Sequence, residues 1–186
     1  MITDKTLALL GAAIYMVQRF EFGLYGLAAH YSHIPAAKKD KQFRDLDPEK
    51  FLRGDLSDLR ATLGQISYTF GNQFHLAGDF LDEFLEKRNI IVHRFWRFNN
   101  DRASEAPFAD PDEYLQEFIT ESEHWIKVLR GIYSLVTEGA AKKEGRESEY
   151  VRSEQDDECV RIFEEFVGIQ NLRQLVSHTT ASADDA

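Results

Sequence analysis

Cysteine is almost absent from this 186-residue chain: Cys159 is the only one, which excludes an internal disulfide. The chain also lacks an apolar leader with a small-residue cleavage site at its start. Both features are typical of proteins that stay in the reducing interior of the cell. We therefore expect a soluble, cytoplasmic protein.

Long hydrophobic runs are missing as well. The most apolar stretch is 11 residues long, from 7 to 17, and Gln18, Arg19 and Glu21 close it. A bilayer needs about 20 apolar residues in a helix. We therefore expect no membrane-spanning segment and no membrane partner, and a core helix at this position.

Basic residues are in the minority, with 22 Lys and Arg against 32 Asp and Glu, so the net charge is −10. Such a surface repels phosphate backbones, which disfavours tight, sequence-blind binding of nucleic acid. One segment departs from this balance, because residues 87–102 hold a single acid, Asp101. The basic residues of this island are Lys87, Arg88, Arg94, Arg97 and Arg102.

Proline is scarce, and none of the four prolines interrupts a long periodic stretch. The spans between them are predicted helices, because apolar residues recur in them at a helical period. Thr3 is the expected N-cap of the first helix, and Asp110 the expected N-cap of a later one with Pro111 at its first position. The predicted helices cover about 4–32, 56–70, 73–98, 110–139 and 150–178.

The connections are predicted to be a polar loop and short helix over 35–55, the latter starting at Asp47-Pro48, and a loop over 99–110. Residues 179–186 are small and polar and are expected to form a disordered tail. No alternation is long enough to build a sheet. The prediction is a single all-α domain over 1–178, an up-and-down antiparallel bundle of four to five helices.

A polar stripe crosses the most apolar part of the third long helix. Asn89, His93 and Arg97 follow at i, i+4 and i+8, so they share one face. Burying such groups is costly unless they are paired or used. Arg88 and His93 are five residues apart, which on a straight α-helix separates them by about 140°. We therefore expect two helices from two chains to be needed to bring both side chains to one point.

The segment Arg88-Asn89-Ile90-Ile91-Val92-His93 resembles the R-x4-H signature of the HEPN superfamily. Residues 17–27, with Glu21 among apolar neighbours, resemble the first helix of that family. The similarity covers about residues 4–138. It implies a four- or five-helix bundle that dimerises and places two copies of the motif in one composite site. Many members are metal-independent endoribonucleases of toxin–antitoxin and antiviral defence systems, and others are non-catalytic binding domains.

The resemblance implies RNA as the substrate and assigns the roles. His93 is the acid and base, since histidine moves protons near neutral pH. Arg88 stabilises the charge that grows on the phosphoryl oxygens, and Asn89 orients either of them. Glu21 supports the basic motif. The predicted rim for RNA consists of Lys87, Arg94 and Arg97, and no metal or other cofactor is expected.

Toxin members that pair with a nucleotidyltransferase antitoxin often carry a tyrosine two places after the histidine, where it is modified. This chain has Phe95 at that place. A modification there is therefore in doubt, although an antitoxin or nucleotidyltransferase remains a partner that the resemblance suggests.

Several alternatives stay open at this point. Arg88 and His93 could serve only to bind a buried carboxylate such as Glu21, in a non-catalytic bundle that binds a nucleotide or a partner protein. The basic rim could be an ordinary solvated face. Glu121 and His124 form one Glu-x-x-His pair, whereas a di-iron bundle needs two. His30 and His33 are interpreted as surface residues at a helix end. Trp96 and Phe98 are expected in the core.

Overall fold

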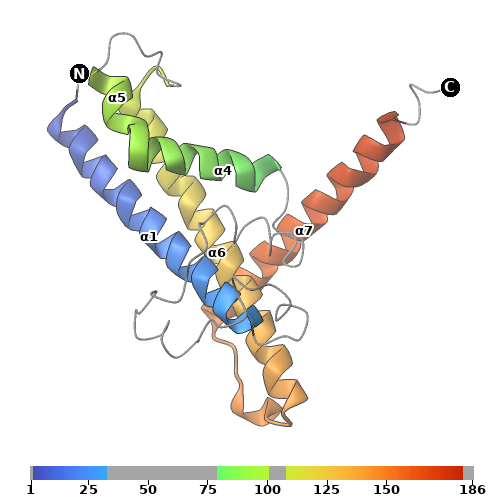
Figure 1. The fold of residues 1–186 in the computed structure, drawn as a ribbon. Helices are drawn as coiled ribbons and strands as arrows, with labels where there is room; N and C mark the ends of the chain where they lie inside the picture. Colours follow the sequence, from blue (N-terminus) through green and yellow to red (C-terminus); the bar gives the residue numbers. More distant parts are fainter. Residues whose placement is uncertain (1, 33–78, 101–107, 182–186) are drawn as a thin grey trace. The chain divides into compact units, whose positions relative to one another are not determined.

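The computed structural model describes residues 2–32, 79–100 and 108–181, and this part of the chain is entirely helical apart from turns, with no strand. The predicted all-α class is confirmed, and the long helices fit a helical bundle (Figure 1). The elements in chain order are α1 (Asp4–Ser32), α4 (Asp79–Asn89), the π-helical turn η2 (Ile90–Arg94), α5 (Phe95–Asn100), α6 (Pro111–Lys143), the 3-10 turn η3 (Glu147–Glu149) and α7 (Glu154–Ala181).

Helix starts follow the predicted capping residues. Thr3 accepts a hydrogen bond from the backbone N–H of Thr6 at 3.1 Å, and Thr6 accepts one from the N–H of Thr3 at 3.2 Å. The carboxylate of Asp110 accepts the N–H of Asp112 at 2.8 Å. Each side chain satisfies an N–H that the first helical turn leaves without a partner. The predicted helix over 56–70, the start of the helix at 73, the loop over 35–55 with Asp47-Pro48, and the tail over 182–186 lie outside the described residues.

Two compact units divide the chain, residues 1–126 and residues 127–186, and α6 runs from the first into the second. Each is described by itself below. The single domain over 1–178 stays a prediction.

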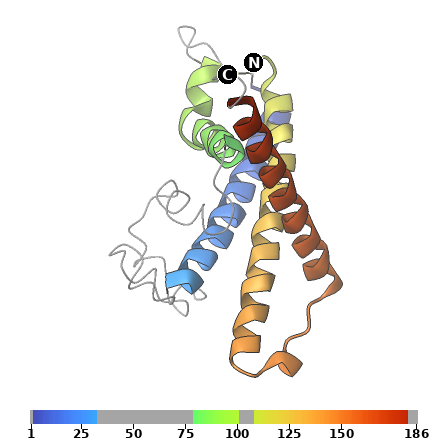
Figure 2. The ribbon, with the colours of Figure 1, turned by 90° about the vertical axis from the view of Figure 1, so that its right-hand side faces the viewer.

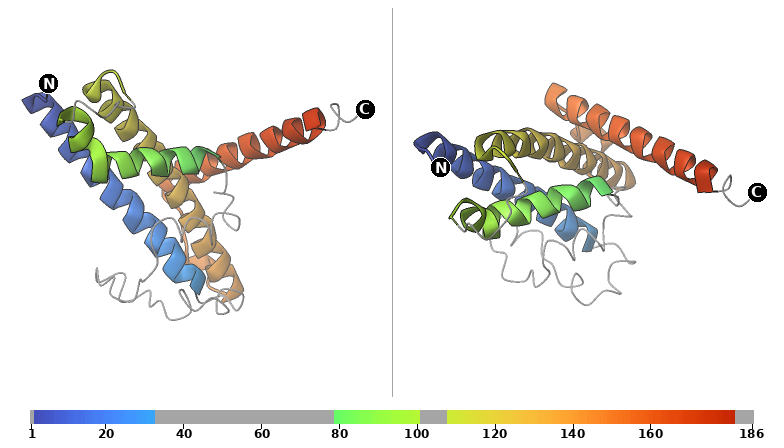
Figure 3. Two further views of the ribbon diagram at one scale, coloured as in Figure 1. Left: turned by 45° about the horizontal axis from the view of Figure 1, so that its top comes forward. Right: turned by 90° about the horizontal axis from the view of Figure 1, so that it is seen from above.

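The core of the first unit centres on Phe84 of α4. Its ring contacts Phe20 of α1 edge-on, with 4.8 Å between ring centroids, and stacks on Phe118 of α6 at 5.1 Å. Trp125 of α6 tilts against the same ring at 5.9 Å. These contacts hold α4 against both α1 and the first half of α6 (Figure 3). Aromatic pairs of this geometry add stabilisation beyond the apolar area that they bury.

The apolar part of helix α1 is longer than expected from the sequence. Its span Asp4–Ala28 is long and apolar enough to cross a membrane by length and composition, so the expectation that no segment reaches this length was wrong. Only Arg19 and Glu21 carry charge between residues 6 and 28, and they do not offset the alanine-, leucine- and aromatic-rich remainder. The core helix of a soluble protein passes the same test, and one face of α1 is buried within the first unit, including Val17, Phe20 and Leu24. The cytoplasmic location stays a prediction.

The second unit is a helical hairpin formed by the end of α6, a connection over 144–153 that contains η3, and α7 (Figure 2). Helix α6 continues past Gly139 to Lys143, four residues beyond the predicted end. Gly145 then adopts a left-handed φ of 71°. The N–H of Gly145 donates to the carbonyl of Lys142 at 3.1 Å and that of Arg146 to the carbonyl of Ala141 at 2.9 Å. This is the Schellman arrangement, which favours glycine.

Helix α7 begins at Glu154 rather than at the predicted Tyr150. Ser153 and Asp156 form a capping box: the N–H of Asp156 donates to Ser153 Oγ at 3.2 Å, and the N–H of Ser153 donates to Asp156 Oδ2 at 3.2 Å. Tyr150 lies before this cap, and its hydroxyl donates to the carbonyl of Ser134 on α6 at 3.0 Å. The reciprocal cap places the helix start at residue 154.

Candidate functional site

Arg88, in the last turn of α4, points at Glu21 in the middle of α1. Its Nε donates to Glu21 Oε1 at 3.0 Å, and its Nη2 donates to the same oxygen. The side chains expose only 16% and 19% of their surfaces, so the pair is shielded from most of the solvent. Removing one partner of such a pair leaves the other charge uncompensated. The expected support of the basic motif by Glu21 therefore has a direct contact behind it.

The third nitrogen of Arg88 faces the other two motif residues. Nη1 donates to Asn89 Oδ1 at 2.9 Å and lies 3.4 Å from His93 Nε2. A guanidinium only donates hydrogen bonds. His93 Nε2 accepts this hydrogen bond only in a neutral ring that carries its proton on Nδ1. The role of Nε2 in this contact depends on the tautomer of the ring.

The π-helical turn η2 is the reason that Arg88 and His93 meet within one chain. It spans Ile90–Arg94, between α4 and α5. A π-helix bonds residue i to i+5 and so turns less per residue than an α-helix, which brings residues five apart closer to one face. The expected wide separation of the two side chains within one chain assumed a straight α-helix and was wrong. The composite site between two chains stays a prediction. Such single π turns are frequent at functional sites.

The interior side of the π turn is apolar. Ile90 and Ile91 are buried within it, and Phe95 at its end exposes 3% of its surface. Asn89 and His93 are exposed on the opposite side. The core contacts of the isoleucines hold the turn in place, and the polar groups of the motif reach solvent beside it.

Tyr25 is a neighbour of the site that the sequence reasoning missed. It follows Glu21 by one helical turn, and burial raises the pKa of its phenol, with the charge of Glu21 adding to the rise and that of Arg88 opposing it. Its phenol therefore stays a neutral hydroxyl in the physiological range. The i, i+4 spacing from Glu21 was the sequence signal that could have found it.

The predicted rim residues separate into two groups. Lys87 turns to α6, where its Nζ lies 2.7 Å from Glu121 Oε2. Arg94 and Arg97 are exposed. The structure therefore brings Arg88, Asn89, His93 and Glu21 together and engages Lys87 elsewhere.

Trp96 contradicts its predicted place in the core, since it exposes 70% of its surface. Phe98 is half-buried and meets Phe108 edge-on, with 6.3 Å between centroids, and Phe95 stacks on the same ring at 5.5 Å. The two phenylalanines, three residues apart, already supply the inward-facing stripe of the short helix α5. Trp96 is left on the outer side for that reason.

Within the described residues, no three or more His, Cys, Asp and Glu side chains lie close enough together to hold a metal ion. Glu121 is engaged by Lys87, and His124 lies exposed beside the ring of Trp125. The side chains of His30 and His33 lie outside the described part of the chain.

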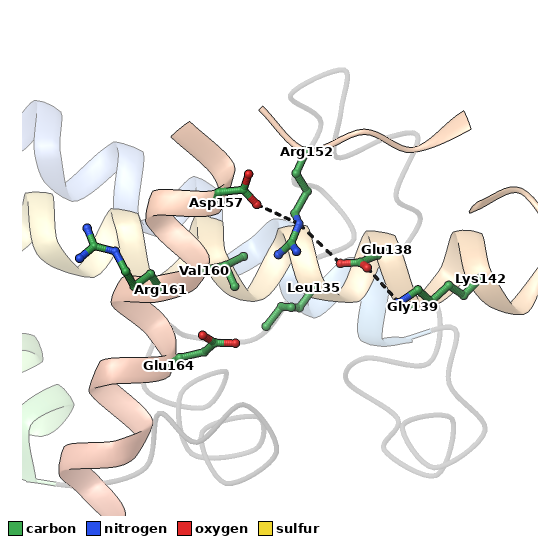
Figure 4. A pocket seen from close by; sticks show the side chains of 9 residues that line it. All are labelled: Leu135, Glu138, Gly139, Lys142, Arg152, Asp157, Val160, Arg161 and Glu164. Carbon is green, nitrogen blue, oxygen red and sulfur yellow. Dashed lines mark ion pairs between the residues drawn. The ribbon is translucent and has the colours of Figure 1, made fainter. Parts of the chain in front are cut away.

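The second unit contains an open hollow of about 500 Å³ between the end of α6 and α7 (Figure 4). Arg152 spans it and pairs with Asp157 at 3.2 Å and Glu138 at 3.6 Å, while Lys142 pairs with Glu138 at 3.0 Å. Hydrogen bonding to Lys142 is the main cause that lowers the pKa of Glu138. The charges neutralise one another, so the hollow favours no charged ligand.

Comparisons with protein-family models, curated proteins and solved structures find no match to this chain.

Proposed function

We propose that the chain is a metal-independent endoribonuclease of the HEPN type. The observation that carries the proposal is the convergence of Arg88, Asn89 and His93 at one exposed point, with Arg88 held from behind by Glu21. An arginine beside a histidine is the minimal set for moving a proton next to a phosphate.

The chemistry assigns one task to each group. His93 Nε2 takes the proton from a ribose 2′-hydroxyl, and that oxygen attacks the adjacent phosphorus. The bond from phosphorus to the 5′-oxygen breaks, the leaving oxygen takes a proton, and a 2′,3′-cyclic phosphate and a 5′-hydroxyl result. Arg88 Nη1 stabilises the charge on the phosphoryl oxygens, where preorganised donors are most effective. Asn89 holds Nη1 in position, and Glu21 holds the other side of the guanidinium.

In the homodimer that the resemblance implies, protonated His93 of a second copy supplies the proton to the leaving oxygen. The toxin–antitoxin or defence setting, and an antitoxin or nucleotidyltransferase partner, belong to the same proposal. They rest on the resemblance alone.

The test is cleavage of RNA by the purified chain in EDTA, with end-group analysis of the products. His93→Ala should lower the rate by about 10²- to 10⁴-fold, the usual worth of general acid–base catalysis. His93 is exposed, so this change leaves the core intact. His124→Ala, which removes another exposed histidine, is the matched control and should cleave normally.

Arg88 needs a gentler set of changes, because Arg88→Ala would strand the charge of Glu21. Arg88→Lys should retain part of the activity, since lysine lacks the planar fork that reaches Glu21 and Asn89 together. Glu21→Gln should lower the rate while leaving His93 in place. Thermal melts distinguish lost chemistry from lost folding.

Two results would overturn the proposal. Absence of cleavage by the parent protein, with His93→Ala and Arg88→Lys changing only the melting temperature, would assign the site to a non-catalytic bundle. Two observations favour that alternative: the net charge of −10, and the ion pair of Arg88 with Glu21, which already occupies one side of the guanidinium. Cleavage that disappears in EDTA and returns with manganese or iron would move the chemistry to Glu121 and His124.

A further inference from the structure

Trp96 is placed unusually for its residue type. It exposes 70% of its surface, whereas Trp125, the other of the two tryptophans, exposes 2%. A ring of this size gains much from burial, so a strongly exposed one beside a candidate site is informative. Phe95, its immediate neighbour, is 3% exposed, so α5 does bury aromatic rings on its other side.

The helical register places Trp96 next to the proposed catalytic histidine. Trp96 and Arg97 follow His93 by three and four residues, the spacings at which side chains are neighbours on a helix surface. Cα–Cβ bonds in a helix tilt toward its N-terminus. Both side chains of α5 therefore lean back over the turn that carries His93.

An exposed indole beside exposed guanidinium groups matches a specific ligand chemistry. Indole rings stack on nucleic-acid bases, and arginines contact the adjoining phosphates. In a duplex the base faces are covered by their neighbours, so only an unpaired base can stack on a side chain. Arg94 and Arg97 are exposed on either side of Trp96 in the sequence and supply the positive charge.

We propose that Trp96 is a base-stacking platform that selects single-stranded RNA. It holds an unpaired base next to the phosphate at Arg88 and His93, while Arg97 contacts the adjoining phosphate. This inference rests on the proposed ribonuclease function and deepens it. Because the rest of the protein is acidic, stacking supplies affinity that its few phosphate contacts do not.

The experiment uses the two tryptophans as internal probes. Trp125→Phe leaves Trp96 as the only indole of the full chain, and circular dichroism verifies the fold. Titration with a 2′-O-methyl oligoribonucleotide, which lacks the attacking hydroxyl, should quench the emission of Trp96 without any cleavage. An abasic oligomer of the same length and the blunt duplex of the same sequence should leave the emission unchanged.

Affinity provides the second measurement, by fluorescence anisotropy of a labelled single strand. Trp96→Ala should weaken binding by about 5- to 150-fold, the range for the loss of one stacked base. Trp96→Phe should retain part of the affinity, since the smaller ring still stacks. Tyr133→Ala, which removes an exposed aromatic ring of the second unit, is the control and should bind as the parent does.

The outcomes separate this inference from the function on which it rests. Unchanged emission on binding, equal quenching by duplex or abasic oligomers, or full affinity of Trp96→Ala would overturn the stacking platform, while RNA cleavage in EDTA would still stand. Quenching by single strands in a protein that never cleaves RNA would support the platform and overturn the ribonuclease. Emission that responds to protein concentration but not to RNA would assign Trp96 to self-association and overturn the platform.

Discussion

Asp156 is a residue whose charge the structure stabilises from two directions. Ser153 Oγ donates to its Oδ2 at 2.6 Å and Arg130 Nε donates to its Oδ1 at 2.8 Å. These hydrogen bonds lower the pKa of Asp156 from 3.8 to about 2. The bond from Ser153 contributes most, and the bond from Arg130 comes next. Because its pKa is lower in the folded state, the ionised carboxylate stabilises the fold at every pH above the pKa of the unfolded chain. This stabilisation is lost as the pH falls through the pKa of the folded state.

We therefore expect Asp156→Asn to be less stable than the parent near neutral pH, by about 1 kcal/mol, as for the loss of a helix cap. The difference should shrink as the pH falls from about 3.8 to about 2. Denaturant unfolding followed by circular dichroism across this range measures it. Glu158→Gln, which removes an exposed carboxylate paired with Lys127, is the control and should cost little. A stability difference that is independent of pH would contradict the assignment.

Among single residues, one charged pair was anticipated and another was not. Glu21 was expected beside Arg88 from the resemblance and as a carboxylate that the arginine could bind, and the contact is present. The pairing of Lys87 with Glu121 was not foreseen. Trp96 was expected inside because it is apolar. Its exposure depends on Phe95 and Phe98 filling the inner face of α5, a choice among aromatic neighbours that composition does not make.

At the scale of elements, Gly131 decides how closely α6 and α7 approach. A Cβ at this position would fall on the carbonyl group of Cys159, 2.8 Å from its carbon and 3.0 Å from Cβ of Phe163. Gly131→Ala should therefore force the hairpin apart and cost about 1–3 kcal/mol, as overpacking does. Thermal and urea unfolding should both reveal the loss.

Gly139 is the matched control on the same helix, since nothing lies within 4 Å of a Cβ built there. Gly139→Ala should stabilise α6 by up to about 1 kcal/mol, because glycine is the weaker helix former. If both substitutions stabilised the chain, the close contact between α6 and Cys159 would not exist in solution.

Two helix starts could be predicted because a cap is a local interaction, and Thr3 and Asp110 act as expected. The start of α7 was missed, because its cap at Ser153 was not identified. The π turn could not be predicted, because its extra residue is held by the burial of Ile90 and Ile91 against other elements. The sequence shows a helical apolar pattern on both sides of His93 but not a local widening of the helix. The sequence therefore named residues that do lie together, although the way in which they come together was not foreseen, and their role as a site stays a prediction.

At the scale of the whole molecule, the all-α class followed from the helical period and the absence of strand-like alternation, and it is confirmed for the described residues. The membrane test on α1 shows the limit of composition: the same apolar residues suit a lipid-facing helix and a core helix. The contact of Glu21 with Arg88 and the packing of Phe20 on Phe84 place one face of α1 against the core of the first unit. Composition alone does not reveal such contacts.

The proposed ribonuclease also makes a prediction about assembly. Sedimentation at micromolar concentration should show a species of twice the 21.5 kDa chain mass, formed through the exposed face of Asn89 and His93, because the leaving oxygen needs a second histidine.

Within that dimer, Arg88 and His93 of one chain act on one phosphate, as their 3.4 Å separation indicates. Mixing His93→Ala with Arg88→Lys should therefore not raise cleavage above that of the two variants alone. A rescue would show instead that each site takes its arginine from one chain and its histidine from the other, and a clean monomer would exclude any composite site.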